Sequence, residues 1–343
     1  MKRRTWAVVA GLLGLVLGCG GGSGGGNDSG GIGDPSARVA EVEYVDGKPA
    51  LFVQDGNGAN RQRIHFTGAT DSIPGNGADL VVADDEILAL GPLRWSPDAR
   101  RLAVVVTLAF EQSEIVVVNA DGSNATVASI NTQLVLGRPD WSPDGTRLVY
   151  GMSTLPVAGG VDAFQTELAT STVTRLTEGA NVGGPGGELR YASDGQSVLW
   201  SKASAGGDDP LADPKSSVKR LALGTGVVTD VATSVQGEVQ GLFRDGTRAL
   251  VARNESLDAG GRTVRALVSV PLDGRGSEIE LANGVLQYAV VMEGDARALP
   301  VIDVSTDPST PKVAYVTLPV TGEAGQLLGA LGNQTVAADV YRR

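Results

Sequence analysis

The segment that most constrains the fold is Arg138–Tyr150, RPDWSPDGTRLVY, in which an aromatic residue, a turn, a basic residue and an apolar run follow one another. Residues 142–145, SPDG, suit a type I turn, because proline presets φ at the second position and glycine is favoured at the fourth. The LVY that follows favours a strand. The segment therefore predicts a strand, a tight turn and a second strand.

This unit recurs along the chain. Its copies centre on Trp95, Trp141, Tyr191 and Phe243, with a degraded copy over Val291–Leu299, at successive intervals of 46, 50, 52 and 48 residues. Such spacing is typical of a repeated unit of four strands. The 48 glycines, together with many Val and Thr residues, likewise favour a β-rich chain with many turns.

A second turn follows later in each unit and joins two further predicted strands. These turns are Asp55-Gly56, Asp121-Gly122, Thr170-Ser171, Gly224-Thr225, Asp273-Gly274 and Thr321-Gly322. There are six such turns but only five internal aromatic units. The first unit is therefore expected to lack an innermost strand, and residues 335–341 are expected to form an additional strand at the C-terminus. We therefore expect this C-terminal strand to pair with Arg38–Val45 and to close a ring, which would hide two open strand edges.

The W-S-P-D-G-x-R-L-x-Y pattern resembles the WD-like β-propeller repeat of the TolB type. The resemblance covers Ala37–Arg343 and implies an all-β, six-bladed propeller with four antiparallel strands in each blade. It also implies structural roles for the repeated residues, in which the aromatic packs between blades and the aspartate caps the turn. These residues are Trp95, Asp98, Trp141, Asp144, Tyr191, Asp194, Phe243 and Asp245.

The N-terminus has the features of an export signal. Lys2, Arg3 and Arg4 precede an apolar run that is short for a membrane span, and the run ends in Val16-Leu17-Gly18-Cys19, which resembles the bacterial lipobox. We expect a lipoprotein signal peptide over residues 1–18, lipidation of Cys19, a Gly/Ser-rich tether over residues 19–36 and a propeller over residues 37–343. Ordinary secretion with an unmodified Cys19 is the alternative. The absence of an acid directly after Cys19 favours the outer membrane.

The formal net charge of −11 disfavours binding to nucleic acid, because phosphates would be repelled. A lone histidine, His65, disfavours the propeller enzymes that depend on placed histidines. The strongest candidate calcium ligands are Asp208, Asp209 and Asp213, since calcium binds several oxygens on a bent loop, although their spacing is not that of an EF-hand. A solvated hairpin tip is the alternative.

Taken together, these features predict a monomeric, non-catalytic envelope lipoprotein without a cofactor. We expect its propeller to bind another envelope protein or a small ligand at a mouth of the central channel, which the innermost strands would line. A propeller enzyme, such as a calcium-dependent lactonase or a lyase that uses carboxylates, is the alternative from another class. A purely structural envelope lipoprotein is the third possibility.

Overall fold

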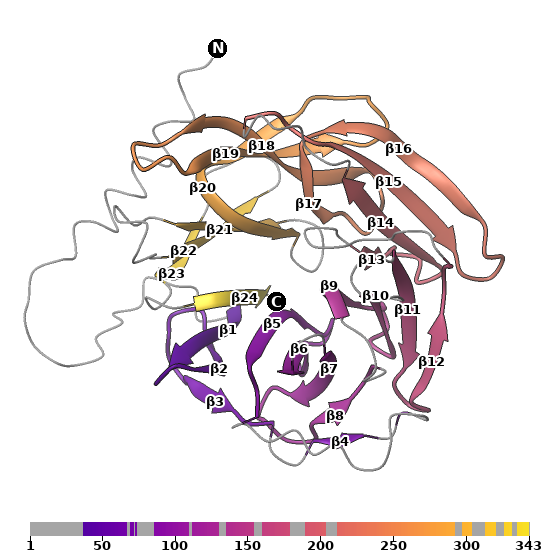
Figure 1. Cartoon of the computed structure of the whole chain (residues 1–343), viewed down its shortest axis with the longest axis vertical. Helices are drawn as coiled ribbons and strands as arrows, with labels where there is room; N and C mark the ends of the chain where they lie inside the picture. The colour runs from indigo at the N-terminus through magenta and orange to yellow at the C-terminus, as the bar shows by residue number, and fades with distance from the viewer. Residues whose placement is uncertain are drawn as a thin grey trace, which may run out of the picture.

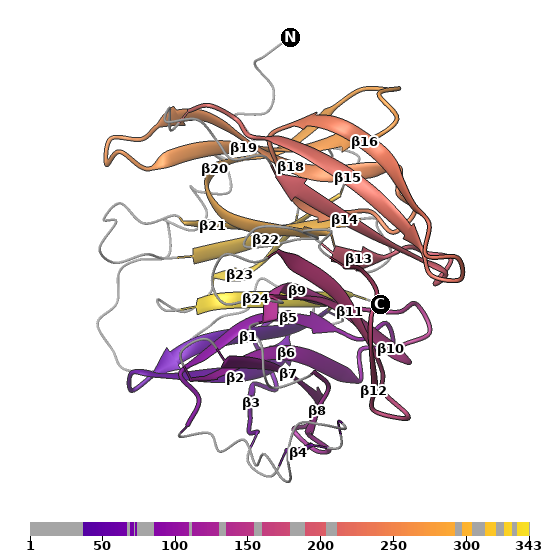
Figure 2. The same ribbon diagram turned by 45° about the vertical axis from the view of Figure 1, so that its right-hand side comes forward.

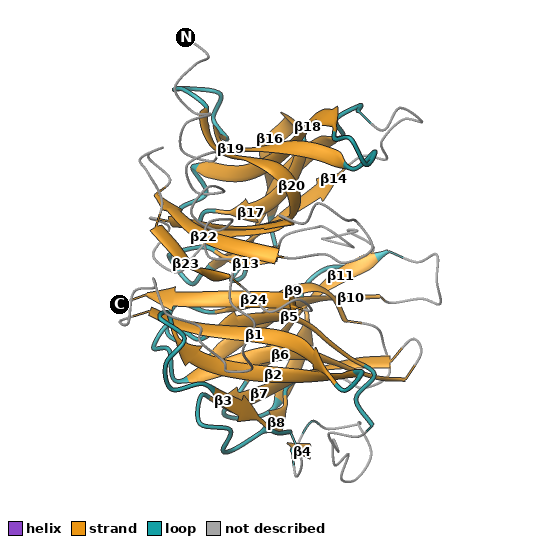
Figure 3. Cartoon of the chain, turned by 90° about the vertical axis from the view of Figure 1, so that its left-hand side faces the viewer, coloured by secondary structure: helices purple, strands orange, loops and turns teal. Residues whose placement is uncertain are grey.

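The computed structural model describes residues 37–66, 69–71, 73, 86–109, 112–129, 135–153, 160–178, 189–203, 211–291, 297–303, 313–319, 326–330 and 335–342. Secondary structure in these parts consists of strands, and the strands are arranged around a common centre (Figures 1 and 3). No helix in them has the length and apolar character that crossing a membrane requires. Residues 1–36, with the expected signal peptide, Cys19 and the tether, lie outside the described residues.

The first blade joins the two ends of the described chain. Its strands, in spatial order, are β24 (Thr335–Arg342), β1 (Ala37–Val45), β2 (Lys48–Asp55) and β3 (Gln62–Ile64). Strand β24 pairs antiparallel with β1 from Ala37↔Arg342 to Glu43↔Thr335, and the two lie side by side in Figures 1 and 2. The predicted closure of the ring by the C-terminal strand is confirmed.

The next three blades follow one another along the chain. The second contains β5 (Ala89–Trp95), β6 (Arg101–Ala109), β7 (Gln112–Asn119) and β8 (Thr126–Val127), with β4 (Thr70–Asp71) added in parallel beside β8. The third contains β9 (Val135–Trp141), β10 (Arg147–Ser153), β11 (Val161–Glu167) and β12 (Thr172–Arg175). The fourth contains β13 (Leu189–Tyr191), β14 (Ser197–Ala203), β15 (Lys215–Ala222) and β16 (Val228–Gln236).

The remaining strands form one seven-stranded sheet. They are β17 (Glu238–Leu242), β18 (Arg248–Leu257), β19 (Thr263–Pro271), β20 (Ile279–Val291), β21 (Arg297–Asp303), β22 (Val313–Pro319) and β23 (Gln326–Ala330). The first half of β20 pairs with β19 up to Gly284, and its second half pairs with β21 from Val285 onward. No loop interrupts β20, so one strand serves both neighbours.

The expectation of an all-β propeller is confirmed, but the expectation of six blades with four antiparallel strands in each is wrong. The described strands form an all-β propeller of five antiparallel sheets, one of which has seven strands and one of which has gained β4 as a parallel addition. The physical reason for the merger is the continuity of β20, whose backbone changes partner between Gly284 and Val285 without leaving the extended conformation.

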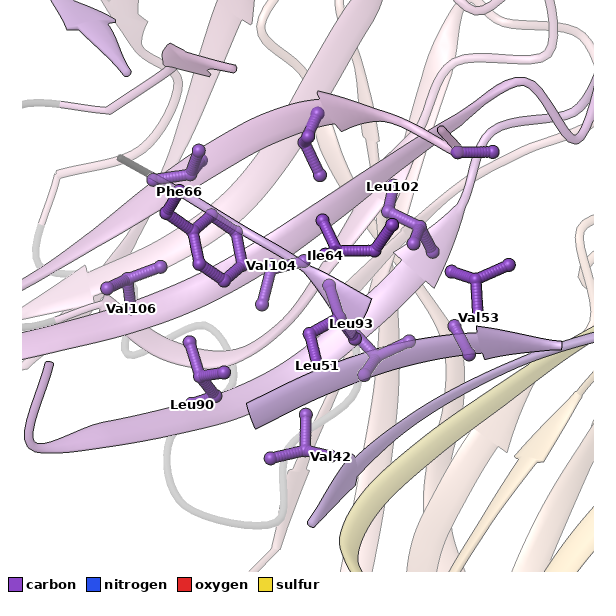
Figure 4. Close-up of a cluster of buried hydrophobic side chains, with 14 of the residues drawn as sticks. Val42, Leu51, Val53, Ile64, Phe66, Leu90, Leu93, Leu102, Val104 and Val106 are labelled. Carbon is purple, nitrogen blue, oxygen red and sulfur yellow. The ribbon is translucent and has the colours of Figure 1, made fainter. Parts of the chain in front are cut away.

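Apolar side chains fill the spaces between successive blades. Between the first and second blades, Leu51 and Ile64 on one side meet Leu93 and Leu102 on the other, each at most 2% exposed (Figure 4). The strands alternate in the direction of their side chains, so each inner strand can supply apolar groups to the spaces on both of its faces. Burial of this kind, at about 25 cal/mol per Å² of apolar surface, is the main force that holds neighbouring blades together.

Candidate functional site: the ring centre and the cavities between blades

The repeated turns lie between the first and second strands of their blades. Asp144 Oδ1 accepts hydrogen bonds from Ser142 Oγ at 2.6 Å and from the backbone N–H of Thr146 at 3.0 Å, and these bonds lower the pKa of Asp144 to about 2. Gly145 has φ +69°, the left-handed conformation that glycine adopts readily. Asp98, Asp194 and Asp245 accept the equivalent backbone bonds in their own turns. Each carboxylate thus holds its own turn.

The aromatic residues of the repeat are buried between blades. Trp95, Trp141, Tyr191 and Phe243 are each at most 3% exposed. The indole Nε1 of Trp141 donates to Arg94 O of the preceding blade at 3.1 Å, and Tyr191 Oη donates to Gln165 Oε1 at 2.9 Å. Their contacts are therefore with the protein itself.

An arginine at the start of the second strand connects each of the first three blades to the next, and we call these residues the latch arginines. Arg38, Arg101 and Arg147 stack over Trp95, Trp141 and Tyr191 of the following blade, with Cζ 5.4, 4.7 and 5.6 Å from the ring centroids. Each also donates to a carbonyl in the following turn, at Ala99, Gly145 and Gly195. Such cation–π contacts contribute about 0.5–1 kcal/mol each where they are exposed, and more when desolvated.

Buried charged side chains connect the blades near the ends of the innermost strands. Asp140, on β9, forms ion pairs with Arg94 Nε at 3.3 Å and with Arg244 Nη1 at 3.1 Å, and its Oδ2 accepts the backbone N–H of Tyr191 at 2.9 Å. Arg190 donates to Leu242 O at 2.6 Å. We call Arg94, Asp140, Arg190 and Arg244 the central hub, and all four are at most 5% exposed.

The hub joins blades that are not neighbours in the ring. Arg94 of the second blade donates to Val291 O at the end of β20, and Arg244, just beyond β17, donates to Trp141 O of the third blade. The first and fourth blades, respectively, lie between these partners in the order of the chain, so the bonds pass inside the intervening blade. The hub lies at one end of innermost strands that were expected to line a channel, and its four side chains are buried there.

Sequence reasoning did not identify the hub, although a signal for it was present. Arg94, Asp140 and Arg190 each directly precede the aromatic residue of a repeat, at the end of an innermost strand. A charged residue at a position that is buried in a β-strand requires a partner. The pattern indicates buried charges, but the sequence does not show which of them meet across the ring.

Of the three candidate calcium ligands, Asp213 alone belongs to the described residues. Asp208 and Asp209 are outside the described residues. Asp213 lies in the segment before β15, where its Oδ1 accepts the backbone N–H of Asn254 at 2.7 Å. Within the described residues, no group of three His, Cys, Asp or Glu side chains is arranged to hold a metal ion. His65 is exposed just after β3.

Two cavities open between blades, away from the axis. One, of about 560 Å³, lies between β16 and the segment from Val270 to Glu278, which contains the end of β19 and the connection to β20. The other, of about 240 Å³, lies between the second and third blades and includes Arg101 in its wall. These cavities provide space beside described side chains.

Glu41, on β1, is a buried acid near the strand that closes the ring. It is 2% exposed, and its Oε1 lies 3.5 Å from Arg61 Nε, while Arg61 Nη2 binds Glu43 at 2.7 Å. Burial raises the pKa of Glu41 to about 7, the charge of Glu43 adds to this rise, and Arg61 opposes it. The folded protein therefore favours the protonated form of Glu41.

This burial predicts a pH-dependent stability. Because the folded pKa is raised above 4.5, the contribution of Glu41 to stability is fully present below pH 4.5 and is lost as the pH rises through about 7. The rise corresponds to about 3 kcal/mol. We expect the free energy of unfolding of Glu41→Gln to exceed that of the wild type by about 3 kcal/mol at pH 8.5 and to equal it at pH 4.5. Urea unfolding at both pH values measures this, and parallel pH profiles would contradict it.

Comparison with solved structures identifies proteins with a similar fold. It is similar to TolB from Acinetobacter baumannii, with 18% identity and a TM-score of 0.59 over 90% of this chain and 67% of TolB. A chain of a nidogen/laminin complex is 10% identical, with a TM-score of 0.50 over 89% of this chain and 98% of that one. Tricorn protease is 11% identical, with a TM-score of 0.52 over 90% of this chain and 30% of the protease.

No protein-family model and no curated protein matches the sequence. At these identities, the likeness to solved structures shows the fold alone. The fold and the hub define the chain as a β-propeller protein. Its resemblance to the TolB-type propeller, first indicated by the repeat, is confirmed at the level of the fold.

Proposed function

We propose that the protein is a monomeric cell-envelope lipoprotein whose propeller is a non-catalytic scaffold for docking a protein partner. In this proposal, residues 1–18 are removed, Cys19 carries the lipid and the glycine-rich tether spaces the propeller from the outer membrane. The scaffold needs no metal or cofactor.

The cavity beside β16, which we call the β16 groove, is the observation that carries this proposal. Seven consecutive residues of β16, Asp230–Gln236, line it. Successive side chains of a strand point to opposite faces, so a cavity over one face would be lined by alternate residues. A cavity lined by all seven must extend along the outer edge of the strand, where β16 has no neighbouring strand among the described residues.

Charge indicates the kind of partner. Asp230, Asp273 and Glu278 line the groove, with Arg253 as its single basic residue. Arg253 is bound to Glu278 at 2.6 Å, and Asp230 is bound to Lys219. Asp273 lies at the turn before β20, and its described bond is to the backbone N–H of Arg275. The unbalanced carboxylate of Asp273 favours a partner segment that carries Lys or Arg.

Charge reversal in the groove tests the docking proposal. Asp273→Lys should weaken capture of the partner from envelope extracts at least tenfold, because a basic segment would then meet a like charge. Asp121→Lys is the matched control: Asp121 occupies the equivalent turn of the second blade and accepts the backbone N–H of Ser123, as Asp273 accepts that of Arg275. Equal loss in both variants, or loss in neither, would contradict docking in this groove.

The lipid anchor has its own test. Cells given radiolabelled palmitate should incorporate label into the full chain, and Cys19→Ser should abolish the incorporation while the protein is still produced. Label that persists in the Cys19→Ser protein would contradict the assignment of Cys19.

A further inference from the structure

The cavity between the second and third blades, which we call the Arg101 pocket, combines one cation with apolar walls. Its volume is about 240 Å³. Asn119 and Asn124 contribute amides, and Val117, Val127 and Leu168 contribute apolar surface. No Asp or Glu is among its lining residues, all of which belong to the described part of the chain. This is notable in a chain of net charge −11.

The guanidinium of Arg101 is held in place by the protein. Its Cζ lies 4.7 Å from the centroid of the Trp141 ring, and its Nη2 donates to Gly145 O at 2.6 Å. Its Nε and Nη1 donate to no described residue. A fixed side chain loses little conformational freedom when a ligand binds, so a ligand that reaches it does not have to order it.

The other latch arginines show what is different about Arg101. In the cross-strand register, Arg38 lies opposite Asp55 and Arg147 lies opposite Glu167. Arg101 lies opposite Asn119, a neutral residue. Directly opposed side chains on a sheet are close enough for charges to interact. The first and third blades therefore supply a carboxylate to their arginine at this position, whereas the second does not.

Asp98 is an acidic residue whose charge interacts with that of Arg101. The charge of Arg101 is among the influences that lower the pKa of Asp98. Asp98 Oδ1, however, already accepts bonds from Ser96 Oγ at 2.6 Å and from the backbone N–H of Arg100 at 3.1 Å, and Asp98 does not line the pocket. It therefore leaves the pocket side of the guanidinium to a ligand.

We propose that the Arg101 pocket binds a small organic carboxylate. The carboxylate accepts hydrogen bonds from Arg101, with the amides of Asn119 and Asn124 nearby, and a short apolar body packs against Val117, Val127 and Leu168. A cavity of about 150 Å³ holds one benzene molecule. The Arg101 pocket, at about 240 Å³, accordingly has room for a ligand of about nine non-hydrogen atoms, which is the size of benzoate.

Benzoate is the probe for this proposal, and the full-length protein is titrated with it by calorimetry. We expect saturable binding at one site, with benzamide and inorganic phosphate each binding at least tenfold more weakly. Benzamide has the same ring without the charge, and phosphate has the charge without the apolar body. Equal binding of benzamide would overturn the role of Arg101, stronger binding of phosphate would overturn the apolar half of the site, and no binding of benzoate would overturn the proposal.

Asn119→Asp is the decisive variant. It gives the second blade the same cross-strand arginine–acid arrangement that the first and third blades contain, so the fold should tolerate it. We expect it to weaken benzoate binding at least tenfold, because the new carboxylate repels the ligand and pairs with Arg101. Arg147→Gln removes a latch arginine from the next blade and should leave binding unchanged. An unchanged affinity in Asn119→Asp, or an equal loss in Arg147→Gln, would overturn the site.

Discussion

Asp140→Asn should lower the free energy of unfolding by about 3–5 kcal/mol, because it removes one partner of a buried ion pair and leaves the other charge uncompensated. Asp140 is 2% exposed and accepts bonds from Arg94, Arg244 and the backbone N–H of Tyr191. Asparagine keeps the shape of the side chain but supplies no charge, so two buried arginines would lose the carboxylate they share. These arginines hold nonadjacent blades together, and the loss should therefore be felt by the whole ring.

Chemical denaturation of the full-length protein, followed by tryptophan fluorescence, measures this loss. Asp144→Asn is the matched control, because Asp144 is exposed and caps a single turn. Its removal should cost about 1 kcal/mol, as expected for hydrogen bonds at the surface. If the two variants lose the same free energy of unfolding, the hub does not stabilise the ring more than a single surface turn does.

Removal of β24 is the second change with a large expected effect. A chain that ends at Ala330 leaves β1 with a free edge along nearly its whole length, and β1 contributes Val39, Ala40 and Val42, all fully buried, to the first blade. An open, apolar edge is prone to pair with another chain. We expect the shortened protein to aggregate, or to unfold roughly 5–10 °C below the full chain, since several kcal/mol of packing are lost and each kcal/mol corresponds to about 1.5–2 °C in a domain of about 300 residues.

A synthetic peptide spanning Thr335–Arg342 provides the control. Added in excess to the shortened protein, it should occupy the edge of β1 and raise the melting temperature, whereas a peptide of the same composition in scrambled order should not. A shortened chain that is monomeric and melts with the full-length protein would contradict closure of the ring by β24.

The repeat made the fold predictable, because the residues that specify each turn and strand are adjacent in the sequence. The turn after Trp141, the type of strand that follows it and the second set of turns such as Asp121-Gly122 depend on a few adjacent residues. The structure places the described turns between strands as expected, and Thr321-Gly322 lies outside the described residues. Ring closure was also predictable, since the first unit lacked a strand that residues 335–341 could supply.

The remaining features depend on contacts between distant parts of the chain. Asp140 gives no local sign that it meets Arg244, 104 residues away. The merger of two blades through β20 likewise depends on a strand that changes partner without a turn, and periodicity alone cannot show where such a change occurs. The Arg101 pocket depends on a register, because Asn119 becomes informative only when it is known to face Arg101 as Glu167 faces Arg147.

Site-specific photo-crosslinking in intact cells tests the central claim, docking along the β16 groove, most directly. A photoreactive residue at Ser234, which is exposed within the groove, should give one discrete adduct with a partner protein, and Asp273→Lys should suppress it. The same residue at Ser123, exposed in the turn between β7 and β8 of the second blade, should give none. No adduct at Ser234, or the same adduct from both positions, would contradict the account.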